Sequence, residues 1–154
     1  MICPEKELIP LLRDLGLTLS IAESCTGGLV AKRITDIPGS SSVFPGGIVS
    51  YCDRVKHQIL GVSEKTLDAF TAVSEQTAKE MALGVCAALH TDIGLSTTGY
   101  DGPGDEEVGL VYVAIAMGGH ALCHELRLSG DRSQIRDQAA DHLLSLVLST
   151  LNAF

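Results

Sequence analysis

The chain has 154 residues, of which 45% are hydrophobic and 19% charged, and its formal net charge is −8 at pH 7. This length and composition predict a single globular domain over residues 1–154, large enough for a layered core. The negative charge argues against nucleic acid and against an anionic membrane surface as partners. Aromatic residues make up only 4%, without tryptophan, which argues against stacking platforms for single strands.

The cysteines and the N-terminus indicate where the protein works. Five cysteines, an odd number without Cys-x-x-Cys spacing, predict reduced thiols in a cytoplasmic protein. Neither a signal sequence nor an apolar run of about 18 residues is present, so we expect no membrane span. His120 and His124 are too weak a pair to predict a metal site. The chain begins at Met1, directly before a helical pattern, and we expect a complete stand-alone module.

Apolar periodicity and turn residues predict interleaved helices and strands. Helices are expected at 4–15 (ended by Gly16), from the Ser24 turn to about 36, at 54–60 (capped by Asp53), at 63–70, at 74–89, and from an Asp131–Gln134 capping box to about 151. Strands are expected at 17–22, 48–52 (buried), 92–97, 108–117 and 120–128, the last two joined at Gly118-Gly119. This order predicts a three-layer α/β/α sandwich on a mixed, mostly parallel sheet.

Polar, glycine-flanked sequence follows three of the predicted strands. These strand ends are Glu23-Ser24, Tyr51-Cys52-Asp53 and Thr97-Thr98-Gly99. Ligands of open α/β sheets bind outside the carboxyl ends of the strands. We therefore expect the three ends to converge on one site.

Ser24 lies where an apolar strand gives way to a helical pattern. The free N–H groups at the start of that helix can bind an anion or stabilise an oxyanion. Gly27 and Gly28 would let a ligand approach the backbone closely. The alternative is a capped strand-to-helix turn, with Ser24 or Thr26 as N-cap and the glycines present for tight packing.

A nucleophilic serine needs a base, and Lys56 is the better candidate. A partly desolvated lysine near a helix start is biased towards its neutral form and can act as a general base. Tyr51 could relay a proton or orient Lys56. The alternatives are a surface Lys56 paired with Asp53, and Tyr51 as a half-buried strand aromatic.

Residues 22–62, AESCTGGLVAKRITDIPGSSSVFPGGIVSYCDRVKHQILGV, resemble the C-terminal domain of the CinA family, including its stand-alone members of the PncC type. The resemblance continues through residues 72–75, 98–103 and 130–132 in the same order, and so covers nearly the whole chain. It implies a nicotinamide mononucleotide amidase, which forms nicotinate mononucleotide and ammonia in pyridine nucleotide salvage. No cofactor is implied, and family members are described as homo-oligomers.

The resemblance also implies roles for individual residues. Ser24 is the nucleophile, Lys56 the base and Tyr51 an assisting group. An arginine of the last helix meets the substrate, either Arg132 in the matching Gly-Asp-Arg or Arg136 one turn on. The remaining substrate-binding positions are Thr26, Gly27 and Gly28 on one wall and Thr98 and Gly99 on the other.

The chain departs from the family pattern in its glycine-rich loop. Residues 99–109 are shorter and more acidic than usual, with Tyr100 and Asp101 in place of small residues. Additional acid raises the cost of binding a phosphate. Two alternatives therefore stay open: a catalytically inactive paralogue that binds a nucleotide or a protein partner, and an amidase for a less anionic amide.

Overall fold

A computed structural model describes residues 3–153, in which five strands form one mixed sheet of order β2-β1-β3-β4-β5. The strands are β1 (Leu19–Glu23), β2 (Gly46–Val49), β3 (Ile93–Gly99), β4 (Leu110–Met117) and β5 (His120–Arg127). β1 pairs in parallel with β2 and β3, whereas β4 is antiparallel to both β3 and β5. Since β5 thus runs in the same direction as β1, β2 and β3, only β4 is reversed.

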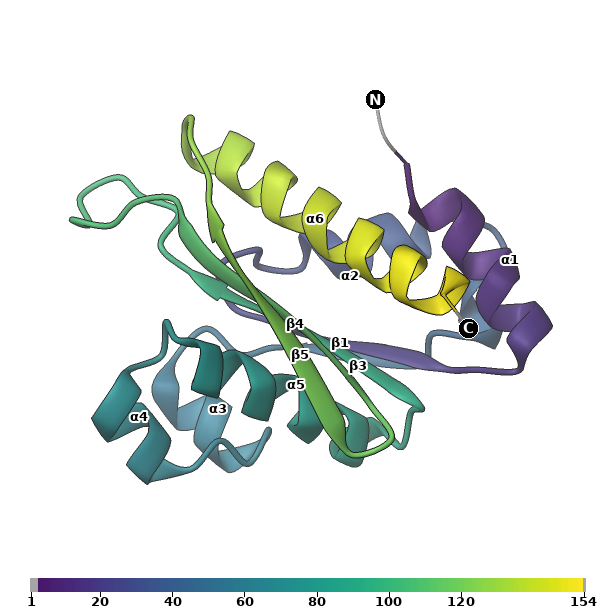
Figure 1. Cartoon of the computed structure of the whole chain (residues 1–154), viewed down its shortest axis with the longest axis horizontal. Coiled ribbons are helices and arrows are strands. Elements are labelled where there is room, and N and C mark those ends of the chain that lie inside the picture. The colour runs from purple at the N-terminus through teal and green to yellow at the C-terminus, as the bar shows by residue number, and fades with distance from the viewer. Residues whose placement is uncertain (1–2, 154) are drawn as a thin grey trace.

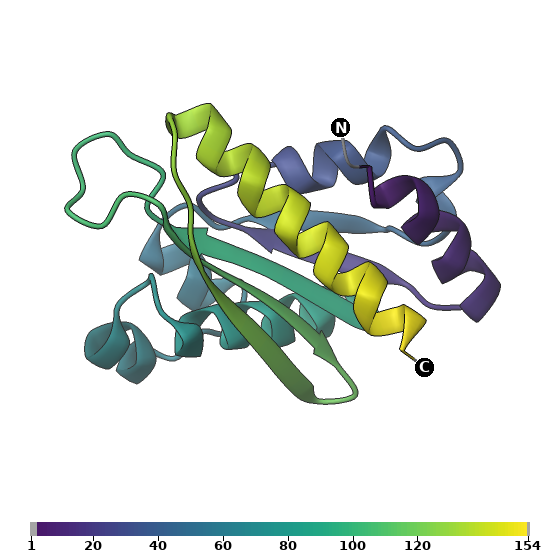
Figure 2. The ribbon, with the colours of Figure 1, turned by 45° about the horizontal axis from the view of Figure 1, so that its top comes forward.

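Helices cover both faces of this sheet (Figure 1). One layer contains α1 (Glu5–Leu15), α2 (Leu29–Thr35) and α6 (Arg132–Asn152), and the other contains α3 (Asp53–Gln58), α4 (Glu64–Phe70) and α5 (Glu75–Leu89). A short 3₁₀ helix, Ser40–Ser42, precedes β2. In Figure 2, α6 crosses the sheet beside α1 and α2, over β3 and β4. The predicted three-layer α/β/α sandwich is confirmed.

The alternation of side chains along β3 separates the two halves of the core. Ile93 and Leu95 are fully buried in the cluster that includes α1 and α6. Gly94 faces α5, and a Cβ atom there would lie 2.2 Å from the Ala82 carbonyl oxygen. Ser96, two residues on, donates its hydroxyl to the Ala78 carbonyl in the same helix at 2.6 Å. The sheet therefore contacts α5 closely, which no larger residue at Gly94 would allow.

Two local predictions are wrong. The run from Ile48 to Cys52 is not a buried strand, because β2 ends at Val49, lies at the edge of the sheet and is half exposed. Asp53 does not cap α3; it is the first helical residue, the N-cap is Cys52 without a side-chain bond, and the helix ends at Gln58. None of the helices within residues 3–153 is long and apolar enough to cross a membrane.

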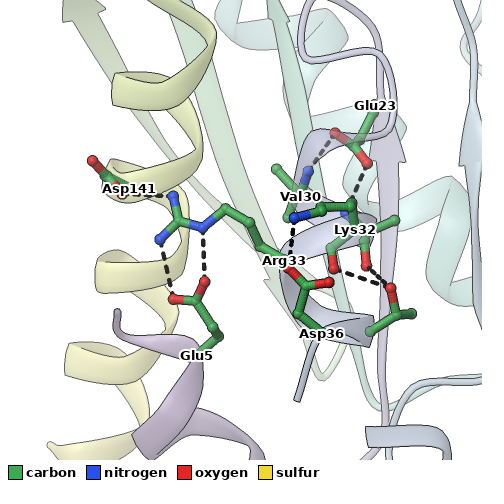
Figure 3. A network of polar contacts seen from close by, with 9 residues as sticks. Glu5, Glu23, Val30, Lys32, Arg33, Asp36 and Asp141 are labelled. Carbon is green, nitrogen blue, oxygen red and sulfur yellow. Dashed lines mark hydrogen bonds and ion pairs between the residues drawn. The ribbon is translucent and has the colours of Figure 1, made fainter. Parts of the chain in front are cut away.

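A polar network joins the three helices of one layer (Figure 3). Arg33 of α2 contacts Glu5 of α1 at 2.7 Å and Asp141 of α6 at 2.5 Å. The Arg33 and Glu5 side chains are 15% and 7% exposed, so this pair is held largely out of water. Partly buried, bidentate arginine pairs fix geometry better than exposed ones. The network therefore fixes α2, which follows the Ser24 turn, against α1 and α6.

Candidate active site

Ser24 lies directly after β1, at the carboxyl end of the central parallel strands. Its backbone N–H donates to the Thr97 carbonyl of β3 at 3.1 Å, which fixes the turn to the neighbouring strand. The Thr26 hydroxyl lies 2.7 Å from the Thr97 hydroxyl. Gly27 and Gly28 have φ values of 58° and 109°, in the region that glycine tolerates best. The two glycines are thus required by the shape of the turn itself.

Lys56 reaches Ser24 from α3, which lies on the face of the sheet opposite α2. Its Nζ lies 3.1 Å from Ser24 Oγ and donates to the Ser50 carbonyl oxygen at 2.7 Å. Lys56 is 1% exposed and Ser24 9% exposed. A short helix after an edge strand therefore places a buried amine within hydrogen-bond reach of a hydroxyl.

Burial controls the charge of Lys56. Desolvation lowers the pKa of its ammonium group, and the negative charge of Asp53 opposes this only in part. Within residues 3–153 no carboxylate forms an ion pair with Nζ. The alternative of a surface lysine paired with Asp53 is therefore wrong. The arrangement provides an amine that can accept the Ser24 proton.

Glu23 occupies the N-terminus of α2, which corrects the expected anion site (Figure 3). Its buried carboxylate accepts from the N–H groups of Val30 at 2.9 Å and Ala31 at 3.0 Å. The capped-turn alternative is also wrong in detail, because the N-cap residue is Gly28 and no side chain of the turn caps the helix. The helix N–H groups are thus not free for an oxyanion.

The serine turn itself offers two further backbone donors. In the described part of the chain, no acceptor is bonded to the N–H groups of Cys25 and Thr26. Both belong to the turn that carries Ser24. They are the donors that an oxyanion formed at Ser24 could use.

Two arginines at the start of α6 and Asp101 form a charged triad beside this turn. Arg132 Nη1 lies 2.8 Å from one Asp101 oxygen, and Arg136 Nε lies 2.7 Å from the other. A Cβ atom at Gly27 would be 3.6 Å from Arg136 Nη1, so this guanidinium borders the serine turn. Both candidate arginines thus contact the same carboxylate. Which of them meets a substrate stays a prediction.

Tyr51 lies with the arginines and not with the lysine. It is 60% exposed, beyond the end of β2, and its hydroxyl accepts from Arg132 Nη2 at 2.8 Å. The alternative of a half-buried strand aromatic is therefore wrong. Its phenol is not hydrogen-bonded to Lys56, so the structure places Tyr51 at the rim of the site.

Thr98 and Gly99 have contacts that do not involve a ligand. The Thr98 hydroxyl donates to the Ala72 carbonyl at 2.7 Å, between α4 and α5. A Cβ atom at Gly99 would lie 2.7 Å from the Leu110 carbonyl of β4. Packing alone explains both residue types. Their role as a substrate wall stays a prediction.

Sequence reasoning missed several groups that build the site. The Ser50 carbonyl holds Lys56, and Thr97 holds the serine turn. The sequence indicates Glu23 only as part of a strand end. It indicates Asp101 only as one of several acids in a loop. A glutamate directly before the serine and a lone buried aspartate offer no local periodicity, so only their position at strand ends could have signalled them.

Cys25, next to the nucleophile, is a buried thiol. It is 3% exposed, and burial together with the nearby Asp101 charge raises its pKa to about 12. The thiolate is the reactive form of cysteine. Cys25 is therefore held in its unreactive form at neutral pH.

The fold and the site together define an α/β domain with a serine–lysine pair at the strand ends and an arginine pair opposite. The model of the CinA C-terminal domain family matches residues 4–151, and the chain belongs to this family. It is 47% identical over 151 residues to a CinA-like protein of Kosmotoga olearia, which covers 96% of this chain and 37% of that protein. Further curated relatives have names that refer to competence-damage induction. The chain spans little more than a third, 36–37%, of the length of these relatives.

Solved structures resemble the chain over nearly its whole length. A competence or damage-inducible protein from Enterobacter asburiae is 36% identical with a TM-score of 0.93, covering 96% of both chains. A competence/damage inducible protein from Agrobacterium tumefaciens is 39% identical with a TM-score of 0.92, covering 97% of this chain and 93% of the other. The sheet order and the helix layers are therefore those of the CinA superfamily.

Proposed function

We propose that the protein is an amidohydrolase that converts nicotinamide mononucleotide to nicotinate mononucleotide and ammonia. The observation that carries this proposal is the distance of 3.1 Å between Lys56 Nζ and Ser24 Oγ, at a site where both residues are buried. A neutral lysine beside a serine hydroxyl is the arrangement of Ser-Lys hydrolases. The substrate follows from the family resemblance and from the arginines beside the turn.

The first half of the reaction forms an acyl-enzyme. Ser24 Oγ attacks the carboxamide carbon while its proton passes to Lys56 Nζ, and the carbonyl oxygen becomes an oxyanion. The N–H groups of Cys25 and Thr26, in the same turn as Ser24, would donate to that charge. When the intermediate collapses, the carbon–nitrogen bond breaks, and Lys56 gives the proton to the departing amine as ammonia.

The second half reverses the roles of the same two groups. A water molecule loses a proton to Lys56 and attacks the ester carbon. Collapse then breaks the bond between that carbon and Ser24 Oγ, and Lys56 returns the proton to the serine oxygen. The products are the free acid and the starting enzyme, so Lys56 must exchange a proton twice in each turnover.

Burial of Lys56 is what makes this cycle feasible near neutral pH. An exposed lysine has a pKa of about 10.4 and is almost wholly charged at neutral pH. Desolvation lowers the pKa of Lys56 and so increases its neutral fraction. The Ser50 carbonyl, which accepts a hydrogen bond from Nζ, fixes the direction of the amine.

Ammonia release from nicotinamide mononucleotide tests the proposal directly. Ser24→Ala and Lys56→Ala should each lower kcat by at least about 10³-fold, the usual effect of removing a nucleophile or its base. Ser41→Ala and Lys65→Ala change exposed residues of the same types and should retain the parent rate.

The outcomes distinguish an active amidase from an inactive paralogue that binds a nucleotide. Loss of turnover in both site variants alone would establish the pair as catalytic. If the folded parent releases no ammonia, or if Ser24→Ala is as fast as the parent, the amidase proposal fails. Binding of the mononucleotide without turnover would then favour an inactive, nucleotide-binding paralogue.

A further inference from the structure

Asp101 is a buried carboxylate that contacts both arginines of the site at once. Its side chain is 9% exposed, with one oxygen 2.8 Å from Arg132 Nη1 and the other 2.7 Å from Arg136 Nε. Asp101 belongs to the loop between β3 and β4, which extends beyond the end of the sheet in Figure 2. The contact thus joins this loop to the first turns of α6.

Most donors of Arg132 already have acceptors. Its Nη1 also donates to the Gly102 carbonyl oxygen, and its Nη2 donates to the Tyr51 hydroxyl at 2.8 Å. Arg136 uses Nε for Asp101, while its Nη1 borders the backbone at Gly27. The donors left for a ligand are therefore mainly those of Arg136, next to the serine turn.

The charges of the triad decide what kind of ligand this region can bind. Two guanidinium groups carry two positive charges, and Asp101 leaves a net charge of +1. A phosphomonoester carries about −1.5 to −2 charges at neutral pH and has three strong acceptor oxygens. Such a group would compete with the Asp101 carboxylate for the positive charge of the two guanidinium groups, whose side chains are 42% and 30% exposed.

We propose that Asp101 is a specificity-determining residue that acts as an internal anion on Arg132 and Arg136, so that a phosphate on the substrate contributes little to binding. The proposal rests on the proposed function, since it concerns the tail of the amide that Ser24 would attack. The site then accepts a pyridine carboxamide riboside about as readily as its phosphomonoester, which stays a substrate. A phosphorylated substrate then meets the Nη donors of Arg136 after Asp101 has already halved the positive charge of the arginine pair.

A purely structural role of Asp101 makes a different prediction. If the carboxylate only holds the loop and the arginines in position, its loss weakens every ligand to a similar degree. If it competes with phosphate, its loss strengthens phosphorylated ligands selectively. The ratio of two dissociation constants therefore separates the two roles, because general loosening cancels in the ratio.

The test uses the whole 154-residue chain carrying Ser24→Ala, so that no ligand is hydrolysed during calorimetry. Nicotinamide mononucleotide and nicotinamide riboside are the matched pair of ligands, and inorganic phosphate is the third probe, all at one ionic strength. Asp101→Asn removes the charge with little change in shape, and Asp101→Glu keeps the charge. Asp105→Asn, an exposed acid of the same loop, is the control.

We expect the Asp101 parent to bind the mononucleotide and the riboside within about threefold of each other. Asp101→Asn should tighten the mononucleotide by about tenfold or more and leave the riboside nearly unchanged, since one charge-assisted contact is worth about that factor. Asp101→Glu and Asp105→Asn should keep the parent ratio. A parent that prefers the phosphorylated ligand by about a hundredfold would overturn the proposal even if Asp101→Asn failed to fold.

The remaining outcomes separate this proposal from the proposed function. Equal weakening of both ligands in Asp101→Asn would overturn the specificity role. If neither pyridine ligand binds but inorganic phosphate binds Asp101→Asn about tenfold more tightly than the parent, the Asp101 proposal holds and the proposed function fails. No gain for any phosphorylated probe overturns the Asp101 proposal.

Discussion

The buried Lys56 makes the free energy of unfolding depend on pH in a way that one substitution removes. In the folded protein its pKa is lowered by desolvation, whereas the unfolded chain binds the same proton with a pKa of about 10.4. Between these two values the unfolded state holds more protons than the folded state. The free energy of unfolding therefore rises with pH across this range and is lowest, as far as Lys56 contributes, below the folded-state pKa.

The magnitude follows from linkage. One proton of difference gives a slope of about 1.4 kcal/mol per pH unit, which is the upper limit for a single group. Lys56→Met removes this contribution while it fills a similar volume. The free energy of unfolding of the parent, minus that of Lys56→Met, should increase as the pH rises towards the unfolded-state pKa of about 10.4, with a slope up to that limit.

Urea unfolding at three pH values and one ionic strength measures this difference. Other groups with raised pKa values, such as Cys25 and Tyr112, are present in both proteins and cancel in the comparison. Lys65→Met, at an exposed position, should run parallel to the parent. Parallel curves for the parent and Lys56→Met would refute the reasoning, because they would mean that Lys56 has the same pKa in both states.

Two further predictions concern neighbours of Ser24. Glu23→Gln should lower the free energy of unfolding by about 2 kcal/mol in urea titrations, since one buried carboxylate accepts both N–H groups at the start of α2. Cys25 should resist iodoacetamide at about pH 7.5 while the exposed Cys52 is alkylated, because the Cys25 thiol is buried and its pKa is raised to about 12. Peptide mass spectrometry measures the alkylation at each position.

Each of these predictions has an internal control. Glu106→Gln changes an exposed glutamate of the β3–β4 loop and should leave stability within about 0.5 kcal/mol of the parent. A comparable decrease in the free energy of unfolding in both variants would show that the Glu23 contact does not stabilise the fold specifically. For the cysteines, urea-unfolded protein should be labelled at both positions, and labelling of Cys25 at the rate of Cys52 in folded protein would contradict its burial.

The sequence was most informative where structure depends on near neighbours. The Asp131–Gln134 capping box is present as predicted, because it needs only four consecutive residues. The convergence of Ser24 and Lys56 was predictable from strand ends of a parallel sheet. These are statements about periodicity and chain direction, which local sequence encodes.

The errors arose where the answer depends on distant parts of the chain. An apolar run from Ile48 to Cys52 looks buried until the sheet order places β2 at an edge. The sequence indicates Asp101 only as additional acid in the glycine-rich loop, whereas in the structure Arg132 and Arg136 from α6 contact it. Pairings thirty or more residues apart leave no trace in hydrophobic periodicity.

The serine turn and the loop that carries Asp101 differ in how tightly contacts hold them, and therefore in how freely their sequences can change. Glu23, directly before the serine turn, binds the N–H groups at the start of α2. Arg33 of the same helix pairs with Asp141 and so joins α2 to α6. The arginines that face the turn belong to the same helix, so their spacing from Ser24 is set by a continuous frame. The loop that carries Asp101 belongs to neither α2 nor α6 and contacts this frame through the two arginines. Insertions, deletions and charge changes there can alter the range of substrates over evolutionary time while the nucleophile and its base stay in register.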